Sequence, residues 1–334
     1  MKKNRIIIGV IAVLAIAAII LISRHSNSTI KRELRDFAIE DTASVDRIFM
    51  VRKDNQQVTL TRVGNHWMVN DRFVVRNDAI DVLLKTLNRL RVKSPVSTSM
   101  LDNSVRMLAT RNTKVEVYHK KKLIKTIYVG GPTQDQMGTF MMLEGSSVPF
   151  VVHIPGFIGY LSSRFFVEEV GWRSTAIFNY NFNDIKSISI ENPEDPQTSF
   201  VLQSPGNNKY SISSMTGASL TIPLDTVAVR YYISKFEKVS LEFFSDSLPQ
   251  RTKDSLQSQK PLRIITLADT KGNVKKLTAW RRPGNGKLDD NGAPMKWDDE
   301  RMWALIDNKQ WVVIQYYVFN PLFVNLNYFG KPVN

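Results

Sequence analysis

Two stretches of the chain share one apolar pattern and decide the fold: NDAIDVLLKTLNRL at residues 77–90 and TVAVRYYISKFEKV at residues 226–239. In each stretch the apolar residues fall at i, i+3, i+4, i+7 and i+10, which places them on one side of an amphipathic helix. They correspond at a constant offset of 149 (80 to 229): Ile80, Leu83, Leu84, Leu87 and Leu90 against Val229, Tyr232, Ile233, Phe236 and Val239. The body of the chain is therefore predicted to be an internal duplication.

The segments around the two helices predict the same strands in each copy. Before each helix, three short alternating segments indicate an antiparallel meander, at 45–51, 58–62 and 66–69 and at 185–190, 199–202 and 209–212. After each helix come a hairpin and a closing strand, at 114–118, 123–129 and 150–153 and at 263–267, 274–278 and 311–314. The closing strands are offset by 161 (150 to 311). The predicted fold class is α+β, with two duplicated units of meander sheet plus packed helices.

Acidic residues mark the starts of the predicted helices. Asp78 and Asp225 stand where a carboxylate can accept hydrogen bonds from free amide groups and meet the positive end of the helix dipole. The run from Trp297 to Trp303 contains Asp298-Asp299-Glu300 and is predicted to begin a further helix for the same reason. These carboxylates are interpreted as structural rather than catalytic.

The first thirty residues predict a membrane anchor. An uninterrupted apolar run from Ile6 to Ile22 would rise about 26 Å as a helix, close to the hydrocarbon thickness of a bilayer. No small-x-small cleavage site follows it at 21–25, so an uncleaved signal anchor is expected rather than a removable signal peptide. A buried core helix is the alternative interpretation. The basic residues before the run favour a cytoplasmic N-terminus.

This organisation predicts a single-pass inner (cytoplasmic) membrane protein with its body in the periplasm. The expected parts are a cytoplasmic tip and signal anchor at 1–23, a linker at 24–43, a first α+β repeat domain at 44–175 and a second at 176–334. Membrane contact is expected through residues 6–22.

Composition and charge limit the possible functions. The chain has no cysteine, which excludes disulfides, thiolate metal sites and cysteine nucleophiles. Of the net charge of +14, residues 24–130 carry 21 basic against 11 acidic side chains. A basic half could attract anionic lipid headgroups or another acidic envelope surface. No recognition helix or RNA-binding strand is found, so nucleic acid is not expected as a partner.

No group of residues has the pattern of a catalytic or metal centre. The loop from Gly284 to Gly292 partly matches a calcium loop, but Lys287 stands where the first carboxylate should be and Asp298 where the last Glu should be. A solvated turn is the favoured interpretation of this loop. The four histidines are scattered, and no phosphate loop or nucleophile elbow is found. We therefore expect no metal, no cofactor and no enzymatic activity.

Aromatic residues concentrate in 157–172 and 311–329. Most of them should belong to the core, and the exposed minority could form a surface for a partner or ligand, because aromatic side chains concentrate interface energy. The residues selected for this surface are Trp172, Arg173, Trp297, Trp303, Tyr316 and Tyr317.

Several of these motifs together resemble a known family. His66-Trp67, the helix 77–90, Val129-Gly130-Gly131, and Asp299 to Trp303 followed by Trp311 to Gln315 are similar to the domain-of-unknown-function family 4340, in a form like that of Bacteroidetes envelope proteins. The similarity covers roughly residues 40 to 330. It implies an association with ABC-transporter subunits of the gliding-motility type, although this chain has its own predicted anchor and no transporter domain. It supplies no catalytic residue.

The expected function is that of a non-enzymatic scaffold or adaptor that binds another envelope protein, such as an ABC-transporter or gliding-type machine subunit. Two alternatives stay open: a binding module for glycan or cell-wall polymer that uses exposed Trp and Tyr, and a hydrolase with an unrecognised site.

Overall fold

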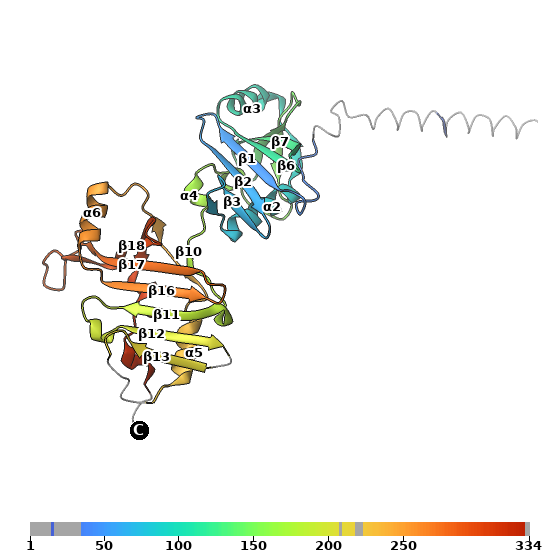
Figure 1. The fold of residues 1–334 in the computed structure, drawn as a ribbon. Coiled ribbons are helices and arrows are strands. Elements are labelled where there is room, and N and C mark those ends of the chain that lie inside the picture. The colour runs from blue at the N-terminus through green and yellow to red at the C-terminus, as the bar shows by residue number, and fades with distance from the viewer. Residues whose placement is uncertain (1–14, 17–34, 207–208, 218–222, 331–334) are drawn as a thin grey trace, which may run out of the picture. The chain divides into compact units, whose positions relative to one another are not determined.

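The described part of the chain divides into two compact units, the first ending at Ser174 and the second beginning at Thr175. The computed structural model describes residues 15–16, 35–206, 209–217 and 223–330 (Figure 1). Each unit has its own antiparallel sheet and its own hydrophobic core. The predicted α+β class is confirmed.

The predicted membrane anchor lies outside the described residues, apart from Ala15 and Ile16. In the part of the chain that is described, no helix has both the length and the apolar character needed to cross a bilayer.

The first unit contains a nine-stranded sheet in the order β4-β3-β2-β1-β6-β7-β8-β9-β5. Its strands are β1 Arg47–Arg52, β2 Gln57–Val63, β3 His66–Val69, β4 Phe73–Val74, β5 Arg91–Pro95, β6 Thr113–His119, β7 Lys122–Pro132, β8 Thr139–Leu143 and β9 Phe150–His153. Its helices are α2 Asn77–Arg89, α3 Thr98–Thr110, η2 Ser162–Arg164 and α4 Glu169–Trp172.

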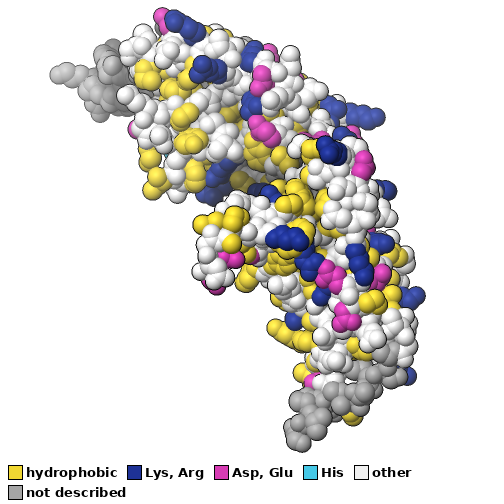
Figure 2. Space-filling view, turned by 90° about the vertical axis from the view of Figure 1, so that its left-hand side faces the viewer, with side chains coloured by type: hydrophobic (Ala, Val, Ile, Leu, Met, Phe, Trp, Pro, Cys, Tyr) yellow, Lys and Arg dark blue, Asp and Glu magenta, His cyan; other side chains and the backbone are white. Residues whose placement is uncertain are grey.

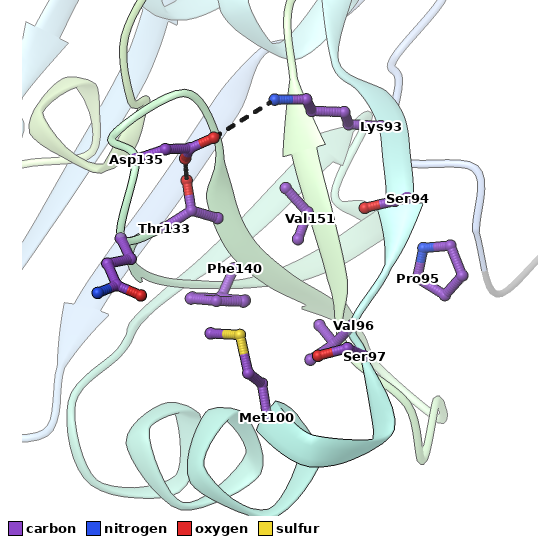
Figure 3. Close-up of a pocket in the computed structure, with 11 residues that line it drawn as sticks. Lys93, Ser94, Pro95, Val96, Ser97, Met100, Thr133, Asp135, Phe140 and Val151 are labelled. Carbon is purple, nitrogen blue, oxygen red and sulfur yellow. Dashed lines mark hydrogen bonds and ion pairs between the residues drawn. The ribbon is translucent and has the colours of Figure 1, made fainter.

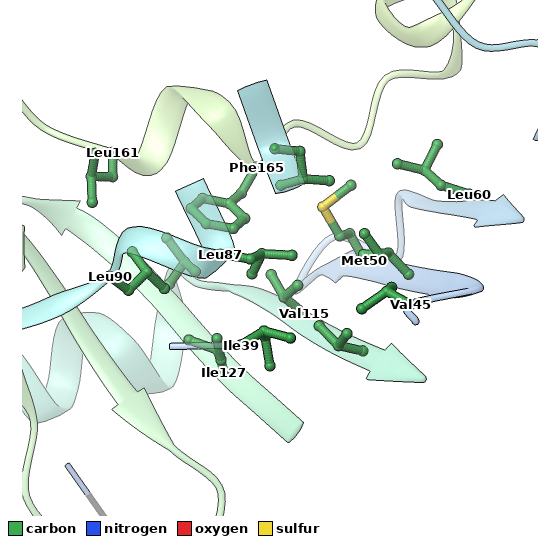
Figure 4. Close-up of a cluster of buried hydrophobic side chains, with 14 of the residues drawn as sticks. Ile39, Val45, Met50, Leu60, Leu87, Leu90, Val115, Ile127, Leu161 and Phe165 are labelled. Atoms are coloured by element: carbon green, nitrogen blue, oxygen red, sulfur yellow. The ribbon is translucent and has the colours of Figure 1, made fainter. Parts of the chain in front are cut away.

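One face of this sheet forms the core of the first unit. The strands alternate as predicted, so that Ile48 and Met50 of β1 are both fully buried. Helix α2 covers this face with the predicted stripe, in which Leu83 and Leu87 are fully buried. Figure 4 shows part of this core, in which the side chains of Met50, Leu87 and Phe165 lie among the strands and helices of the first unit.

Helix α3 lies against the opposite face of the same sheet, over β7 and β8 (Figure 1). A Cβ atom added at Gly130 would come within 2.8 Å of Leu108 Cδ2, so the glycine lets the helix approach the strand closely. The sequence did not reveal α3, whose apolar stripe is narrow, with Leu108 as its one buried large apolar residue among those described.

The segment before the first strand also belongs to the first unit. Phe37 is 1% exposed and packs edge-on against Phe150, with ring centroids 6.0 Å apart. Lys125 Nζ donates to the carbonyl oxygens of Asp36 and Ala38, each at 2.6 Å. The C-terminal end of the predicted linker 24–43 is therefore fastened to the sheet.

The second unit contains an eight-stranded sheet in the order β13-β12-β11-β16-β17-β18-β19-β15, and a two-stranded pair, β10-β14. Its strands are β10 Ala176–Phe178, β11 Ile185–Glu191, β12 Phe200–Gly206, β13 Lys209–Ser214, β14 Val239–Ser240, β15 Phe243–Phe244, β16 Arg263–Asp269, β17 Val274–Pro283, β18 Trp297–Ile306 and β19 Gln310–Gln315. Its helices are η3 Phe182–Asp184, η4 Pro196–Thr198, α5 Thr226–Ser234, α6 Gln250–Ser258, α7 Tyr316–Phe319 and η5 Leu326–Phe329.

Apart from β4, the two large sheets have the same strand order along the chain and in space. Helix α5 covers the core face of the second sheet, as α2 does in the first, and its residue Tyr232 is fully buried. Helix α6 lies on the other face, where Leu256 packs in a small cluster with Trp280 and Trp311.

The prediction of a helix beginning at Trp297 is wrong, because residues 297–306 form strand β18. From Arg301 onward the pattern is strand-like: Met302 and Ala304 face the core, and Trp303 faces the other side. The buried carboxylate of Asp298 has a structural role in the strand, since its Oδ1 accepts hydrogen bonds from the amides of Glu300 (2.9 Å) and Arg301 (3.0 Å).

The two predicted helix caps differ. Asp225 is the N-cap of α5, and its Oδ1 accepts hydrogen bonds from the amides of Val227 (2.8 Å) and Ala228 (3.2 Å). Asp78 lies in the first turn of α2 without capping it and pairs with Arg76 at 3.1 Å instead. The prediction for Asp225 is confirmed, and the prediction that Asp78 caps its helix is wrong.

This difference gives a matched pair of stability predictions. Asp225→Ala should lower the free energy of unfolding by about 1 kcal/mol, because two amides lose their acceptor. Asp78→Ala should change it by less than about 0.5 kcal/mol, because an exposed ion pair contributes little. Urea denaturation of both variants measures the two values, and equal losses would contradict the assignment of the cap.

Candidate functional site

The first unit has an open groove of about 580 Å³ on the α3 side of its sheet, beside the edge strand β5 (Figure 3). We call it the β5 groove. It is formed by β5, the start of α3, the turn between β7 and β8, and the strands β8 and β9. Its lining residues are Lys93, Ser94, Pro95, Val96, Ser97, Met100, Thr133, Gln134, Asp135, Phe140 and Val151.

The floor of the groove is apolar because three neighbouring strands contribute one position each to the same face. Val151 of β9 pairs with Phe140 of β8 on one side and with Ser94 of β5 on the other. Met100 of α3, which is 38% exposed, closes one wall. The small side chain of Ser94 keeps the groove open at the β5 side.

A β-bulge in β5 supplies one side of the rim. Val92 pairs with Val152 and Ser94 pairs with Val151, so Lys93 is an extra residue in the strand. Bulges redirect side chains and are frequent beside functional sites. Here Lys93 Nζ lies 3.9 Å from a carboxylate oxygen of Asp135, on the opposite rim (Figure 3).

The turn between β7 and β8 supplies the other side of the rim. Asp135 accepts hydrogen bonds from the Thr133 hydroxyl and from the amide of Met137 (3.0 Å), and the Thr133 hydrogen bond is the main reason why the pKa of Asp135 is lowered. A Cβ added at Gly138 would meet Val151 Cγ1 at 2.5 Å, so the glycine lets the turn approach the floor. The rim therefore carries a hydrogen-bonded carboxylate, Asp135, and an exposed ammonium group, Lys93, above an apolar floor.

Strand β5 ends the sheet and pairs with β9 alone among the described residues. Free edges can bind an extended segment of another chain, but lysine and proline discourage indiscriminate strand pairing. Lys93 and Pro95 are both exposed on this strand. The arrangement suits a peptide segment whose apolar side chain enters the groove while its polar groups meet the rim.

The corresponding place in the second unit carries bulkier side chains. Val313 of β19 pairs with Trp303 and with Phe243 of β15, as Val151 pairs with Phe140 and Ser94 in the first unit. Phe243 thus stands where the first unit has a serine. Beside it, α6 packs Leu256 onto Trp280, Leu305 and Trp311.

Two of the six residues predicted for a partner surface are buried. Trp172 is 0% exposed, stacks on Phe166 with ring centroids 4.1 Å apart, and donates Nε1–H to the Phe166 carbonyl oxygen (3.0 Å). Arg173 is 3% exposed and lies 3.9 Å from the centroid of the Phe73 ring. Both are structural residues of the first unit, so the prediction that they lie on a surface is wrong.

The other four predicted residues belong to the second unit. Tyr317 is 89% exposed and Trp297 is 38% exposed, with Lys296 Nζ lying 5.3 Å from its ring centroid. Trp303 is half-buried beneath Arg282, and burial raises the pKa of the half-buried Tyr316. Exposed aromatic side chains are therefore present here, although none of the four lines the β5 groove.

The loop between Pro283 and Pro294 forms a turn that is held by its own hydrogen bonds and by contacts with the start of β18. Asp289 Oδ1 accepts hydrogen bonds from the amides of Asn291 and Ala293, each at 2.9 Å. Lys287 Nζ bonds Glu300 at 2.8 Å. Within the described ranges, no cluster of three or more His, Asp or Glu side chains could hold a metal ion.

The surface charges form no single field on the face drawn in Figure 2, where basic side chains lie next to acidic ones. Among the described residues, ion pairs join Arg52 to Glu168 at 2.8 Å and Lys275 to Asp307 at 2.7 Å.

The sequence did not predict the β5 groove, because its lining residues are dispersed over 93–100, 133–135, 140 and 151. A usable signal was present in Lys93-Ser94-Pro95, an exposed lysine and a proline next to a strand, which is typical of a guarded sheet edge.

Comparison with known proteins identifies one family. The family model described as a domain of unknown function (DUF4340) matches residues 67–261, which is 195 of the 334 residues and more than half of the chain. The matched range begins in β3 and ends between α6 and β16, so it includes parts of both units. Neither a curated protein nor a solved structure matches the chain.

Proposed function

The chain belongs to the DUF4340 family, and from this premise we propose that it is a membrane-anchored extracytoplasmic adaptor that binds a segment of another envelope protein. It acts by binding rather than by catalysis. Residues 6–22 hold it in the inner membrane, and both units lie in the periplasm.

The β5 groove is the observation that carries this proposal. Its apolar floor of Phe140 and Val151, with Met100 at one wall, suits an apolar side chain. Lys93 and Asp135 carry opposite charges and can bind the backbone and polar groups of a peptide. In a purely apolar pocket these groups would be buried without hydrogen-bond partners.

We further propose that the two units are copies of one ancestral unit, and that the first copy kept or gained the binding role. The equal strand order and the offset of 149 between α2 (from Asn77) and α5 (from Thr226) support the duplication. The difference between Ser94 and Phe243 supports the division of roles, because a large phenyl ring in the second unit stands where the first unit has a small serine side chain.

The partner that the family resemblance favours is a subunit of an ABC transporter or of a gliding-type envelope machine. Such a subunit would present an extended segment with one large apolar side chain and at least one charged group to the β5 groove.

Site-specific crosslinking tests the proposal. Because the chain has no cysteine, Met100→Cys places one thiol at the groove and Val227→Cys, whose parent residue is 74% exposed on α5, places one on the second unit. With a photoreactive label on the thiol, position 100 should capture one envelope protein in its native membranes, and position 227 should not.

Filling the groove provides the control for specificity. Ser94→Phe introduces the residue that stands at the equivalent place in the second unit, and capture from position 100 should fall at least tenfold because the phenyl ring occupies the groove. Equal capture from both positions, or capture that survives Ser94→Phe, would refute the adaptor role of the groove.

A second candidate function is binding of glycan or cell-wall polymer. The exposed rings of Tyr317 and Trp297 favour it, since aromatic faces are common contacts for sugars. Retention on a peptidoglycan column that is lost in Trp297→Ala and unaffected by Ser94→Phe would favour this candidate over the adaptor.

A further inference from the structure

The hairpin between β6 and β7 in the first unit ends in an unusual tip, residues 119–124, which we call the β6–β7 tip. Lys120, Lys121 and Lys122 follow one another there, and all three are exposed. None of them forms an ion pair within the described residues. One carboxylate lies nearby: Asp46 Oδ2 accepts a hydrogen bond from the backbone amide of Lys120 at 2.6 Å.

The backbone of the tip is one that lysine does not favour. Lys120 and Lys121 have φ angles of +47° and +65°, and they form the two-residue turn of the hairpin. Turns with both central residues in the left-handed region favour Asn-Gly, because side chains with a Cβ are strained there. A pair of lysines at such a position indicates a role for the charges beyond folding.

A β-bulge next to the turn exposes two apolar side chains. Tyr118 pairs with Leu123 and Val117 pairs with Lys125, so Ile124 is an extra residue in β7. In a regular strand, Leu123 and Ile124 would face opposite sides of the sheet. Here both are exposed, at 46% and 43%.

The equivalent hairpin of the second unit lacks these features. Its turn between β16 and β17 places Gly272 at the left-handed position, with φ of +88°. Asp269 Oδ1 accepts hydrogen bonds from the amides of Lys271 (2.9 Å) and Asn273 (2.8 Å), which fixes the turn. This hairpin therefore has one lysine in its turn and one exposed apolar side chain, Val274, beside it, where the first unit has a run of three lysines and two exposed apolar side chains.

The β6–β7 tip lies close to the place where the chain comes in from the predicted membrane anchor. Lys125, directly after the bulge, holds the carbonyl oxygens of Asp36 and Ala38. Residues 23–34, between the apolar run and the described body, reach at most about 40 Å when fully extended. The tip is thus tied within reach of the membrane surface.

We propose that the β6–β7 tip docks onto anionic phospholipid headgroups of the leaflet that faces the body. The three lysines meet the headgroup charges, and Leu123 and Ile124 enter the interfacial layer beneath them. This inference rests on the membrane anchor in the proposed function. Docking fixes the first unit against the membrane and so sets the height at which the β5 groove meets its partner.

An environment-sensitive fluorophore on a single cysteine tests the docking in the full chain. Leu123→Cys reports on the β6–β7 tip, and Val274→Cys, whose parent residue is 60% exposed beside the equivalent turn, is the matched control. In vesicles that contain phosphatidylglycerol, the label at 123 should shift to the blue and be quenched by brominated acyl chains. The label at 274 should do neither, and phosphatidylcholine alone should abolish the effect at 123.

Two charge variants separate docking from folding. Changing Lys120, Lys121 and Lys122 to Gln should lower the ratio of docked to undocked tip about a hundredfold, roughly fivefold for each lysine. Lys120→Asn with Lys121→Gly removes two charges and supplies the residues that the turn favours. This variant should raise the unfolding temperature of the first unit and weaken docking to lipid. If the lysines had only a structural role, stability and docking would not change in opposite directions.

The outcomes for the anchor and for the tip are distinguishable. Extraction of the full chain by alkaline carbonate would show that residues 6–22 do not span the bilayer. In that case the fluorescence of the label at 123 in the presence of vesicles would still show whether the β6–β7 tip binds anionic lipid. A label at 123 that ignores phosphatidylglycerol, or a crosslink from the tip to an acidic protein in place of lipid, would overturn the inference.

Discussion

Replacing Trp172 by alanine is expected to lower the free energy of unfolding of the first unit by about 3–5 kcal/mol. The side chain is fully buried in the core of this unit and stacks on Phe166 at an interplanar angle of 16°. The substitution removes this contact, the hydrogen bond to the Phe166 carbonyl oxygen (3.0 Å) and the apolar area of the indole. Hydrogen exchange read by mass spectrometry measures the loss, because peptides from each unit report separately.

The control for this prediction is Trp297→Ala, which removes the same side chain from a site that is 38% exposed. Its effect should be less than half as large, because part of the indole already contacts water. Peptides from 175–330 should keep their protection in Trp172→Ala, since the second unit has its own core. Equal loss of protection throughout the chain would show that the two units do not unfold separately.

Replacing Tyr232 by alanine should have the corresponding effect on the second unit, again about 3–5 kcal/mol. Its ring is fully buried, and its centroid lies 5.2–6.2 Å from the ring centroids of Phe200, Phe236 and Phe329. Its hydroxyl donates to the Leu322 carbonyl oxygen at 2.9 Å, and burial raises the pKa of the phenol well above its usual value. Protection should fall in peptides from 175–330 and persist in those from the first unit.

Tyr232→Phe divides this effect into its two parts. The phenylalanine keeps the ring contacts and leaves the Leu322 carbonyl oxygen without its donor, which should cost about 1–3 kcal/mol. The control is Tyr231→Phe at a neighbouring residue that is 63% exposed, where the change should be within about 0.5 kcal/mol. A Tyr232→Phe loss as large as that of Tyr232→Ala would contradict the role of the ring cluster.

The parts of the fold that the sequence predicted are those with a sustained local period. The stripes of α2 and α5 and the alternating strands β1, β2, β11 and β16 could be read directly, because burial follows their period of 3.6 or 2. Helix α6 went unrecognised for the same reason as α3, since Leu256 is the one buried residue found in it.

The sequence-based predictions were wrong where the same local sequence pattern is compatible with two structures. Asp298-Asp299-Glu300 could begin a helix or stand at the start of a strand, and the pairing of β18 with β17 and β19 decided for the strand. The closing strands were matched one residue out of register. Phe150 and Val152 face the first core while Val312 and Ile314 face the second, so equivalent positions are 162 apart (150 to 312) rather than 161.

The candidate site could not be predicted, because its geometry depends on contacts between distant segments. Lys93 meets Asp135, and Ser94 meets Val151, only after β5 has been placed next to β9 at the end of the sheet. Trp172 shows the opposite difficulty. An aromatic residue without a periodic apolar pattern around it can belong to the core or to an interface, and the stacking on Phe166 that decides between the two is visible only in the fold.

The most direct test of the central claim, that the chain is an adaptor acting through the β5 groove, is quantitative co-purification from native membranes. The full chain and its Ser94→Phe variant would be crosslinked, solubilised in mild detergent and compared by mass spectrometry, with Ser234→Phe on the exposed face of α5 as the control. We predict one envelope protein at near-equal amounts with the parent chain and with Ser234→Phe, and at least tenfold less with Ser94→Phe. Equal recovery with all three chains, or recovery of the chain alone or with cell-wall fragments, would contradict the account.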